Sequence, residues 1–536
     1  MVFKSLYPPL PQYPEANVYE LFFNNPDQNA LPDYTLYVDA ESGRKFQRSE
    51  FKQRVHDAMT TFGAPVSNGG LGLSKEKGDI IGIYSSNCID YPTTIISALS
   101  LTVPFVPLSS YSTHFELCHL LRTSKCTVLF VHAGLLQKAL SAAKEVGLSE
   151  DRIFIIEGQV PGRKSLQDLL DETRKRGIPR ELPRPAKKDT LAYLMFSSGT
   201  TGLPKAVMVS QGNLWYTVLS QLAVAAEDAR VLETPPPQAP LVLLGVLPFH
   251  HTYGLISFCI RPMNGWATCV VVPRWKAEVV VKAIEKYRVQ VLLLVPSMIH
   301  QLVHSGLLQK ADTSSLAIIN SGAAYLPPKV SDAMQKLART ARLQEGYGLS
   351  ECARLVRDDG TDADIGEPGE LWLGGNSVTL GYYNNPKATK ESFVNGWLRT
   401  GDRFKTDGKG TFFFVDRAKD TLKVSGAQVS PTEIEQVLLG HPGKLISDAS
   451  VAGVSGGRTS DELLPRAWVV LSEEGRKKGA DAVLKELEKW TNDNLSSYKR
   501  LRGGLEVVSE IPKSPTGKVL RRVLQDRYEQ KVKAKL

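Results

Sequence analysis

The feature that most constrains this chain is a strand–loop–strand segment between residues 191 and 210. Leu191–Phe196 is a short apolar run that favours a buried strand, and Ala206–Val209 resumes as a second strand. Between them lies the loop Ser197-Ser198-Gly199-Thr200-Thr201-Gly202. Glycine lets backbone N–H groups approach an anion closely, and the hydroxyls add donors. Lys205 adds a mobile positive charge at the far edge, so the segment suits a polyphosphate ligand.

This loop differs from the P-loop of many nucleotide-binding proteins. Only two residues separate Gly199 from Gly202, and Lys205 is followed by alanine. The P-loop has four residues between its first glycine and a Gly-Lys-Ser/Thr string. The structural alternative is a plain polar β-hairpin, because Ser, Thr and Gly are common in turns.

Strand-like and helix-like segments alternate on both sides of this loop. The expected strands are 79–84, 103–107, 127–131, 241–247, 268–272, 289–295 and 317–320, and the expected helices are 91–101, 114–123, 210–226 and 277–287. Such alternation predicts an α/β fold with two parallel α/β layers in a large N-terminal domain.

Beyond Gly366 the sequence changes to short strands and turns, which predict a small β-barrel or sheet within the same domain. Residues 416–419 indicate a domain boundary, so the expected domains are 1–416 and 417–536. The second is a smaller, compact α+β unit, in which the string Pro431–Leu439 opens a helix with proline near its first turn.

The loop at 197–205 resembles the phosphate loop of the adenylate-forming superfamily, which includes acyl-CoA synthetases, 4-coumarate–CoA ligases, luciferases and peptide-synthetase adenylation domains. Further segments resemble the same superfamily in the same order, so the resemblance covers nearly the whole chain. They are Leu247-Pro-Phe-His-His-Thr-Tyr-Gly254, Asn320-Ser-Gly-Ala-Ala324, Gln344-Glu-Gly-Tyr-Gly-Leu-Ser-Glu351, Trp397-Leu-Arg-Thr-Gly-Asp402, the charged run 416–426 and Ile511-Pro-Lys-Ser-Pro-Thr-Gly-Lys518.

The resemblance implies a site for ATP with Mg²⁺. The residues it assigns to the phosphates are Ser198, Gly199, Thr200, Thr201, Gly202, Lys205 and Ser350. Those it assigns to the adenine are Gly322, Ala323, Ala324, Tyr347 and Gly348. Asp402 is expected to accept from the ribose hydroxyls, Arg417 to contact the nucleotide, and Glu351 to hold Mg²⁺.

The resemblance also implies the catalytic groups. His251 takes the place of the histidine beside the acyl carboxylate, and Lys518 that of the lysine that stabilises charge during adenylation, with Lys205 assisting. The resemblance further implies a hinge near residues 416–420, with Lys419 as its pivot, and therefore a mobile smaller domain. After this domain rotates, Lys423 and Gly426 are expected to face coenzyme A.

These assignments predict an AMP-forming acyl- or aryl-CoA ligase whose substrates are a small carboxylic acid, ATP and coenzyme A. Three alternatives stay open: amino-acid adenylation, luciferase-like oxidation, and a nucleotide-binding relative with impaired catalysis. Amino-acid adenylation is disfavoured because Val295-Pro-Ser-Met298 lacks the aspartate that usually holds a substrate amine, and no carrier domain follows Lys518.

The chain departs from this resemblance after Ala353. Relatives carry an additional Gly-rich turn and strand there, whereas this chain passes almost directly to Arg354-Leu-Val-Arg357. Loss of a barrel strand predicts an exposed sheet edge and weakened folding or activity. Either a missed exon or a genuine deletion accounts for the shortening.

Composition and the C-terminus bear on location and partners. The net charge is +9, and from Ser497 onward eleven Lys or Arg face four Asp or Glu, without the aromatic interleaving of a nucleic-acid-binding segment. The six cysteines form no CxxC pair, which indicates reduced thiols, and no segment is apolar enough to predict a transmembrane helix. Ala534-Lys535-Leu536 resembles the peroxisomal Ser-Lys-Leu signal, so we expect a peroxisomal import receptor as partner, with the cytoplasm as the alternative location.

Overall fold

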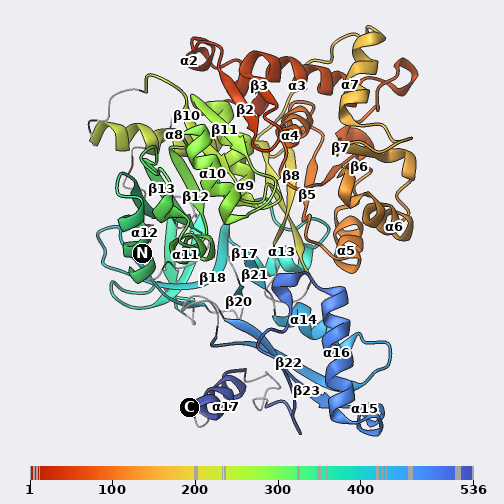
Figure 1. The fold of residues 1–536 in the computed structure, drawn as a ribbon, viewed down its shortest axis with the longest axis vertical. Coiled ribbons are helices and arrows are strands. Elements are labelled where there is room, and N and C mark those ends of the chain that lie inside the picture. The colour runs from red at the N-terminus through yellow and green to blue at the C-terminus, as the bar shows by residue number, and fades with distance from the viewer. Residues whose placement is uncertain are drawn as a thin grey trace.

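The structure is a computed structural model, and it places a larger domain above a smaller one, joined at a narrow waist (Figure 1). The described residues are 2–3, 7, 10, 12–197, 203–231, 233, 237–322, 326, 328–346, 352–357, 360–417, 422–424, 427–429, 431–456, 463–512 and 521–533.

One parallel sheet of the larger domain has the strand order β14-β13-β12-β10-β11-β2-β3, in which β3 runs antiparallel to its neighbour. Its strands are β2 (Thr35–Asp39), β3 (Lys45–Gln47), β10 (Leu241–Gly245), β11 (Ala267–Val271), β12 (Val291–Leu294), β13 (Ile318–Gly322) and β14 (Arg342–Gly346). Helices α10 (Ala277–Tyr287), α11 (Pro296–His304) and α12 (Pro328–Leu337) cover one face. All four residues of β12 are buried, as expected for a central strand covered on both faces.

The second parallel sheet has the order β7-β6-β4-β5-β8-β9, in which β9 runs antiparallel to β8. Its strands are β4 (Ile81–Tyr84), β5 (Phe105–Leu108), β6 (Val128–His132), β7 (Ile153–Glu157), β8 (Leu191–Ser197) and β9 (Lys205–Ser210). Helices α5 (His114–Ser124) and α6 (Leu136–Val146) cover its outer face. The two parallel α/β layers expected from the sequence are therefore confirmed.

The largest hydrophobic core lies between these two sheets. Tyr37 of β2, Phe105 of β5 and Phe258 all belong to it and are completely buried. The remaining helices of the larger domain are α1 (Val18–Phe23), α2 (Pro26–Asn29), α3 (Arg48–Gly63), α4 (Asp90–Ser100), α7 (Leu166–Lys175), α8 (Gln211–Val231), α9 (Thr252–Gly254) and α13 (Pro386–Ser392). Because β-strand side chains alternate between faces, each sheet contributes to this core and to an outer one.

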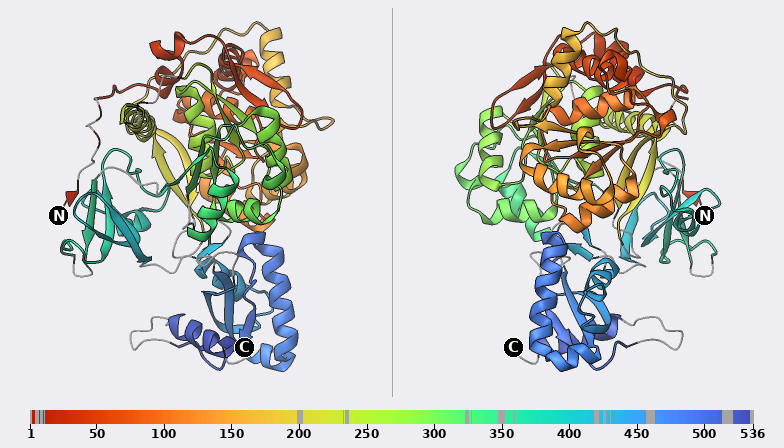
Figure 2. Two further views of the ribbon diagram at one scale, coloured as in Figure 1. Left: turned by 60° about the vertical axis from the view of Figure 1, so that its left-hand side comes forward. Right: turned by 90° about the vertical axis from the view of Figure 1, so that its right-hand side faces the viewer.

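A third, antiparallel sheet stands beside the parallel ones (Figure 2). Its order is β1-β15-β16-β18-β17, with β19 also paired to β18. The strands are β1 (Val2–Phe3), β15 (Cys352–Val356), β16 (Gly369–Gly374), β17 (Phe393–Val394), β18 (Trp397–Thr406) and β19 (Phe412–Arg417). Of the two forms expected, barrel or sheet, the described strands form an open sheet. The edge of β15 that the shortened link was expected to expose is partly covered, because Val2 and Phe3 pair with Arg354 and Ala353.

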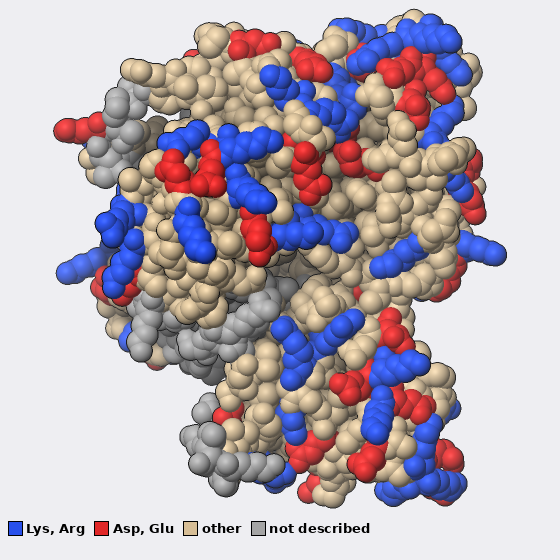
Figure 3. All heavy atoms as spheres, viewed as in Figure 1, with Lys and Arg blue, Asp and Glu red and all other residues tan. Residues whose placement is uncertain are grey.

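The smaller domain is α+β, as expected. It contains a β20 (Leu422–Val424) and β21 (Ala427–Val429) pair and a three-stranded sheet of β22 (Ile446–Val454), β23 (Leu464–Leu471) and β24 (Leu505–Val507). Its helices are α14 (Pro431–Leu439), α15 (Glu473–Lys478), α16 (Ala480–Asn494) and α17 (Arg521–Lys533). Figure 3 shows Lys and Arg side chains on both sides of the hollow between the domains.

Three further expectations concern the chain as a whole. Lys419 lies outside the described residues, so the hinge and the boundary at 416/417 stay predictions. The five cysteines whose side chains are described, Cys88, Cys118, Cys126, Cys259 and Cys269, are buried and unpaired, which agrees with reduced thiols. In the described part of the chain, each helix is too short or too polar to cross a bilayer.

Candidate functional site

The carboxyl ends of the two parallel sheets meet at Asn87, which follows β4 and is buried. Its Nδ2 donates to the carbonyl oxygens of Leu247 (3.0 Å) and Val272 (3.2 Å), which follow the other sheet's β10 and β11. Its Oδ1 accepts from the N–H of Phe249 at 2.9 Å. Ligands of α/β sheets bind beyond the carboxyl ends of the strands, so this junction is the candidate site. Sequence reasoning passed over Asn87, although the polar run Ser85-Ser86-Asn87 after a buried strand is a usable signal.

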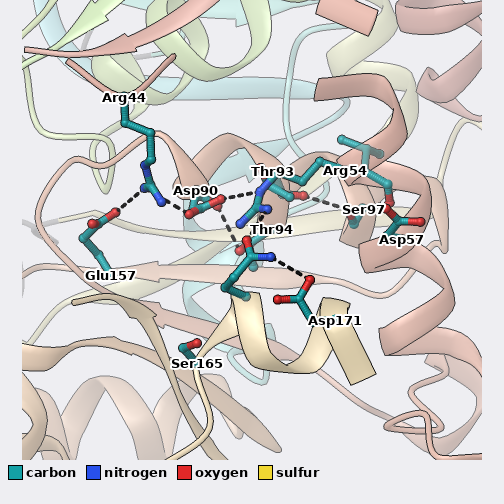
Figure 4. A network of polar contacts seen from close by, with 12 residues as sticks. Arg44, Arg54, Asp57, Asp90, Thr93, Thr94, Ser97, Glu157, Ser165 and Asp171 are labelled. Carbon is teal, nitrogen blue, oxygen red and sulfur yellow. Dashed lines mark hydrogen bonds and ion pairs between the residues drawn. The ribbon is translucent and has the colours of Figure 1, made fainter. Parts of the chain in front are cut away.

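Asn87 is anchored in turn through the start of α4, where Asp90 sits in a buried ion network (Figure 4). Arg54 Nε lies 2.7 Å from Asp90 Oδ1, and Arg44 Nη2 lies 3.2 Å from Asp90 Oδ2. Arg44 also pairs with Glu157 at 3.0 Å. Because Arg54 and Asp90 are both buried, each charge depends on its partner, and the network fixes the segment that carries Asn87.

His251 lies on the loop that Asn87 holds. It is the N-cap of α9, where its Nδ1 accepts from the N–H of Tyr253 at 3.4 Å. The chain then forms a π-helix at Leu255–Ile260, a rare geometry that often marks functional sites. Gly254 is required here because a Cβ atom would lie only 2.2 Å from the Pro248 carbonyl oxygen. The position of the predicted catalytic histidine is therefore fixed by its N-cap hydrogen bond and by the close backbone contact at Gly254.

The two neighbouring histidines are kept neutral. Burial, with a contribution from His251, lowers the pKa of His250 to about 3, and burial also lowers the pKa of His251. His251 is nevertheless exposed to solvent, and His250 is half-buried. A neutral imidazole at pH 7 can hydrogen-bond a substrate carboxyl without adding a charge.

The predicted polyphosphate segment is a β8–β9 hairpin in which Ser197 pairs with Lys205. The Lys205 ammonium lies 5.3 Å from the centre of the Tyr382 ring. His119 of α5 donates from Nε2 to the Pro204 carbonyl oxygen at 2.9 Å. The hairpin alternative thus describes the backbone correctly, and the phosphate-binding role of its loop stays a prediction.

Two predicted nucleotide-binding residues from separate motifs are brought together. Asp402 of β18 is directly opposite Arg417 of β19 in the antiparallel register. Asp402 is 7% exposed, and its N–H donates to Thr400 Oγ1 at 3.1 Å. Asp402 is therefore buried in the strand pair that ends at Arg417, with its backbone N–H bound to Thr400.

Gly322, predicted to line the adenine, ends β13 and is buried. Just before it, Asn320 Oδ1 and Ser321 Oγ are buried and have no hydrogen-bond partner among the described residues. Buried polar atoms are seldom left unpaired, and because consecutive residues of a strand point to opposite faces, one of these two atoms can face a polar ligand such as a purine edge.

The catalytic and binding roles of all the predicted residues stay predictions. Lys423 lies on β20 and Arg417 on β19, and the structure describes only their backbone. Outside the described residues lie Ser198, Gly199, Thr200, Thr201, Gly202, Ala323, Ala324, Tyr347, Gly348, Ser350, Glu351, Lys419, Gly426, Lys518, Ala534, Lys535 and Leu536.

Helix α5 contacts the β8–β9 hairpin, here called the phosphate hairpin after its predicted ligand, through His119. The same helix also forms hydrogen bonds with the smaller domain. Lys499 Nζ donates to Glu116 Oε1 of α5 at 2.7 Å and to Glu433 Oε1 of α14 at 2.8 Å. Ser496 donates to Glu116 through its N–H (3.2 Å) and its hydroxyl. All three charged side chains are buried, so this cluster, Glu116–Lys499–Glu433, is a water-excluded contact between the domains.

The pKa values of the two carboxyl groups in this cluster shift in opposite directions. Burial opposes ionisation of Glu116, but Lys499 and Ser496 lower its pKa below the usual value. For Glu433 burial dominates and raises the pKa. Burial alone lowers the pKa of Lys499, but Tyr498 and the two carboxylates raise it. The cluster therefore favours the ionised form of Glu116 more than that of Glu433.

Comparisons with known proteins give a consistent result along the chain. A profile of the AMP-binding enzyme family matches residues 66–363, and one of the AMP-binding enzyme C-terminal domain matches residues 433–518. The chain is 30% identical to the probable 4-coumarate–CoA ligase 1 of Dictyostelium discoideum, over 98% of this chain and 97% of that protein. It is 31% identical to a putative acyl-coenzyme A synthetase of Emericella nidulans, over 85% and 86%. Its fold is similar to that of the amide bond synthetase McbA from Marinactinospora thermotolerans, with a TM-score of 0.77, 20% identity and coverage of 96% and 99%.

Proposed function

Because the chain belongs to the AMP-binding enzyme family of adenylate-forming enzymes, which use ATP and CoA, we propose that it is an ATP-dependent acid–thiol ligase. It activates a carboxylic acid as an acyl-adenylate and transfers the acyl group to coenzyme A. The observation that carries this proposal is the 30% identity to a CoA ligase along nearly the entire chain. The register that pairs Asp402 with Arg417, and the position of His251 beside the junction of the two parallel sheets, support the adenylation step.

In the first half-reaction, a carboxylate oxygen of the acid attacks the α-phosphorus of ATP. The new acyl–phosphate bond forms as the bond between the α- and β-phosphates breaks, and pyrophosphate leaves. Lys205 and Lys518 stabilise the negative charge that develops on the phosphate oxygens. His251 hydrogen-bonds the carboxyl group as a neutral imidazole, which avoids an ion pair that would weaken the attacking oxygen.

The nucleotide is held from two sides. Asp402 accepts hydrogen bonds from the ribose hydroxyls, and Arg417, opposite it, contacts the nucleotide. Of the unpaired oxygens of Asn320 and Ser321, which point to opposite faces of β13, one fits the polar edge of adenine beside Gly322. Glu351 holds Mg²⁺, which neutralises phosphate charge when bound.

In the second half-reaction, the thiol of coenzyme A attacks the acyl carbon. The thioester bond forms, the bond to AMP breaks, and the thiol proton passes to solvent. Lys423 and Gly426 of the smaller domain line the path of the thiol, and Lys419 is the pivot that brings them to the site.

Pyrophosphate release with ATP and a panel of aliphatic and aromatic acids, with and without coenzyme A, tests this function. We expect acid-dependent pyrophosphate release and a thioester product detectable by mass spectrometry. The variant Asp402→Ala should lose most activity, whereas Asp407→Ala, in the exposed turn of the same hairpin, should keep it.

Each other product rejects the proposal in favour of a different reaction. Acyl-adenylate that passes to an amine, or that is oxidised, without thioester formation indicates an adenylate-forming enzyme of another kind. Absence of pyrophosphate with every acid indicates an impaired relative.

A further inference from the structure

A cluster of three potential metal ligands lies on the outer face of the larger domain, away from the residues assigned to the reaction. His114 is the first residue of α5, Cys118 follows one turn later, and Glu145 is in the last turn of α6. One ligand atom from each residue lies within 4.8 Å of the other two. Among the described residues this is the one group of three such side chains close enough to hold an ion.

The distances are those of a small coordination sphere. Cys118 Sγ lies 3.8 Å from the ring nitrogens of His114, and His114 Nε2 lies 3.7 Å from Glu145 Oε2. Zinc–sulfur, zinc–nitrogen and zinc–oxygen bonds of about 2.0–2.3 Å at tetrahedral angles separate ligand atoms by about 3.3–3.6 Å. The Cys118–His114 and His114–Glu145 separations exceed these values by a few tenths of an ångström, and the Cys118–Glu145 separation, which is within 4.8 Å, closes by rotation of the exposed Glu145 side chain.

The placement of the ligands on the two helices also fits. His114 and Cys118 are four residues apart on α5, so their side chains lie on one helix face. The two oxygens of Glu145 contact different residues. Oε1 accepts a hydrogen bond from Arg122 Nη2 at 2.5 Å, and Oε2 lies 3.7 Å from His114 Nε2. Arg122 thus orients the carboxylate as an outer-shell partner. Ser141 Oγ, 3.1 Å from His114 Nε2, or a water molecule can take a fourth position.

We propose that His114, Cys118 and Glu145 form a binding site for a divalent transition-metal ion of the zinc class. A thiol, an imidazole and a carboxylate suit zinc, whereas Mg²⁺ prefers oxygen ligands, so this site does not serve the ATP-bound magnesium. On binding, the Cys118 thiol gives its proton to solvent and the thiolate coordinates the ion. Glu145 is exposed and His114 partly exposed, which leaves an entry path from solvent.

A metal ion here clamps α5 to α6. Helix α5 carries His119, which holds the phosphate hairpin, and Glu116, which holds the smaller domain. An ion at its first turn therefore stiffens the helix on which both contacts depend. Binding to the folded state alone also raises stability in proportion to the logarithm of the metal concentration.

Titration of the chelator-treated full chain with Co²⁺ tests the site, because cobalt bound to a thiolate has a characteristic charge-transfer absorption. We expect one cobalt ion per chain with this band, and its displacement by Zn²⁺. Cys118→Ser should abolish the band, whereas Cys126→Ser, at a buried cysteine two residues beyond α5, should leave it unchanged. Removal of the His114 ligand in His114→Ala should weaken binding by at least about 10-fold.

Absence of the band, or a band that Cys118→Ser does not remove, overturns the proposal. If circular dichroism shows that Cys118→Ser does not fold, Glu145→Gln decides, because weakened metal binding supports the site and unchanged binding overturns it.

Discussion

Replacement of Glu116 by glutamine should loosen the smaller domain from the larger one without unfolding either. Glu116 accepts a charged hydrogen bond from Lys499 at 2.7 Å and two hydrogen bonds from Ser496. Glutamine keeps the shape but has one acceptor oxygen, so it cannot serve both the capping box, in which the Thr113 N–H donates to Oε2, and Lys499, which donates to Oε1. The change therefore removes one buried negative charge from the contact between the domains.

The size of the effect follows from what Lys499 retains. A buried charge left wholly unpaired costs about 3–5 kcal/mol. Lys499 keeps Glu433 at 2.8 Å, so the expected loss is nearer that of one hydrogen bond to a charged group, about 1.5–3 kcal/mol. At about 1.4 kcal/mol per factor of ten, the docking equilibrium shifts by roughly 10- to 100-fold.

Hydrogen–deuterium exchange of the full chain, read by mass spectrometry, measures this shift. Exchange should rise in residues 494–501 and at the start of α5, and stay unchanged in β22 and β23, the core of the smaller domain. Glu172→Gln, which removes an exposed acid paired with Lys164, is the matched control and should change nothing. Because the pKa of Glu116 is lowered on docking, the contact should persist at neutral pH and weaken as the pH falls below the usual carboxyl value of 4.5.

Unchanged exchange at 494–501 in Glu116→Gln would refute the reasoning. So would equal exchange increases throughout the smaller domain, since that pattern means unfolding and not undocking.

Three further outcomes are expected. Asp90→Asn removes the counter-charge of buried Arg54 and should lower the free energy of unfolding by about 3–5 kcal/mol in urea titrations, whereas Asp171→Asn, at an exposed acid, should change it by less than about 1 kcal/mol. Folding stability should fall as the pH is lowered from 6.5 towards 3, because His250 binds a proton in the unfolded state but stays neutral in the native state, where its pKa is about 3. His250→Gln should make the free energy of unfolding less dependent on pH in this range, and an unaltered slope contradicts the assignment. We also propose peroxisomal import through residues 534–536: an N-terminal fluorescent fusion should form puncta that deletion of these residues disperses, and a diffuse signal from the intact fusion rejects it.

Much of the fold follows from local sequence patterns. The expected helix at 277–287 matches α10 residue for residue, and the helix expected to open at Pro431 begins there as α14, because apolar spacing and helix-start signals act within a few residues. The expected strands on both sides of the phosphate loop became β8 and β9 for the same reason. The family could be identified from its motifs, since each is a short string of consecutive residues.

Contacts between distant segments could not be read in this way. From the sequence, Glu116 belongs to the local capping box Thr113-x-x-Glu116, and Lys499 is one of many basic residues near the C-terminus. Only the docking of the smaller domain on α5 brings them together across 383 positions and buries both. The same holds for Asn87, whose partners at 247 and 272 belong to another sheet.

The candidate site shows the same division. The sequence determined which residue types are present, including Asp402, Arg417 and His251, because function requires those chemical groups in those short strings. The tertiary structure decided that Asp402 faces Arg417, through the register of β18 and β19, and that His114 and Cys118 meet Glu145, through the packing of α5 on α6. Local propensity fixes the elements, whereas register and packing depend on the burial of apolar surface from the whole chain, which no short segment encodes.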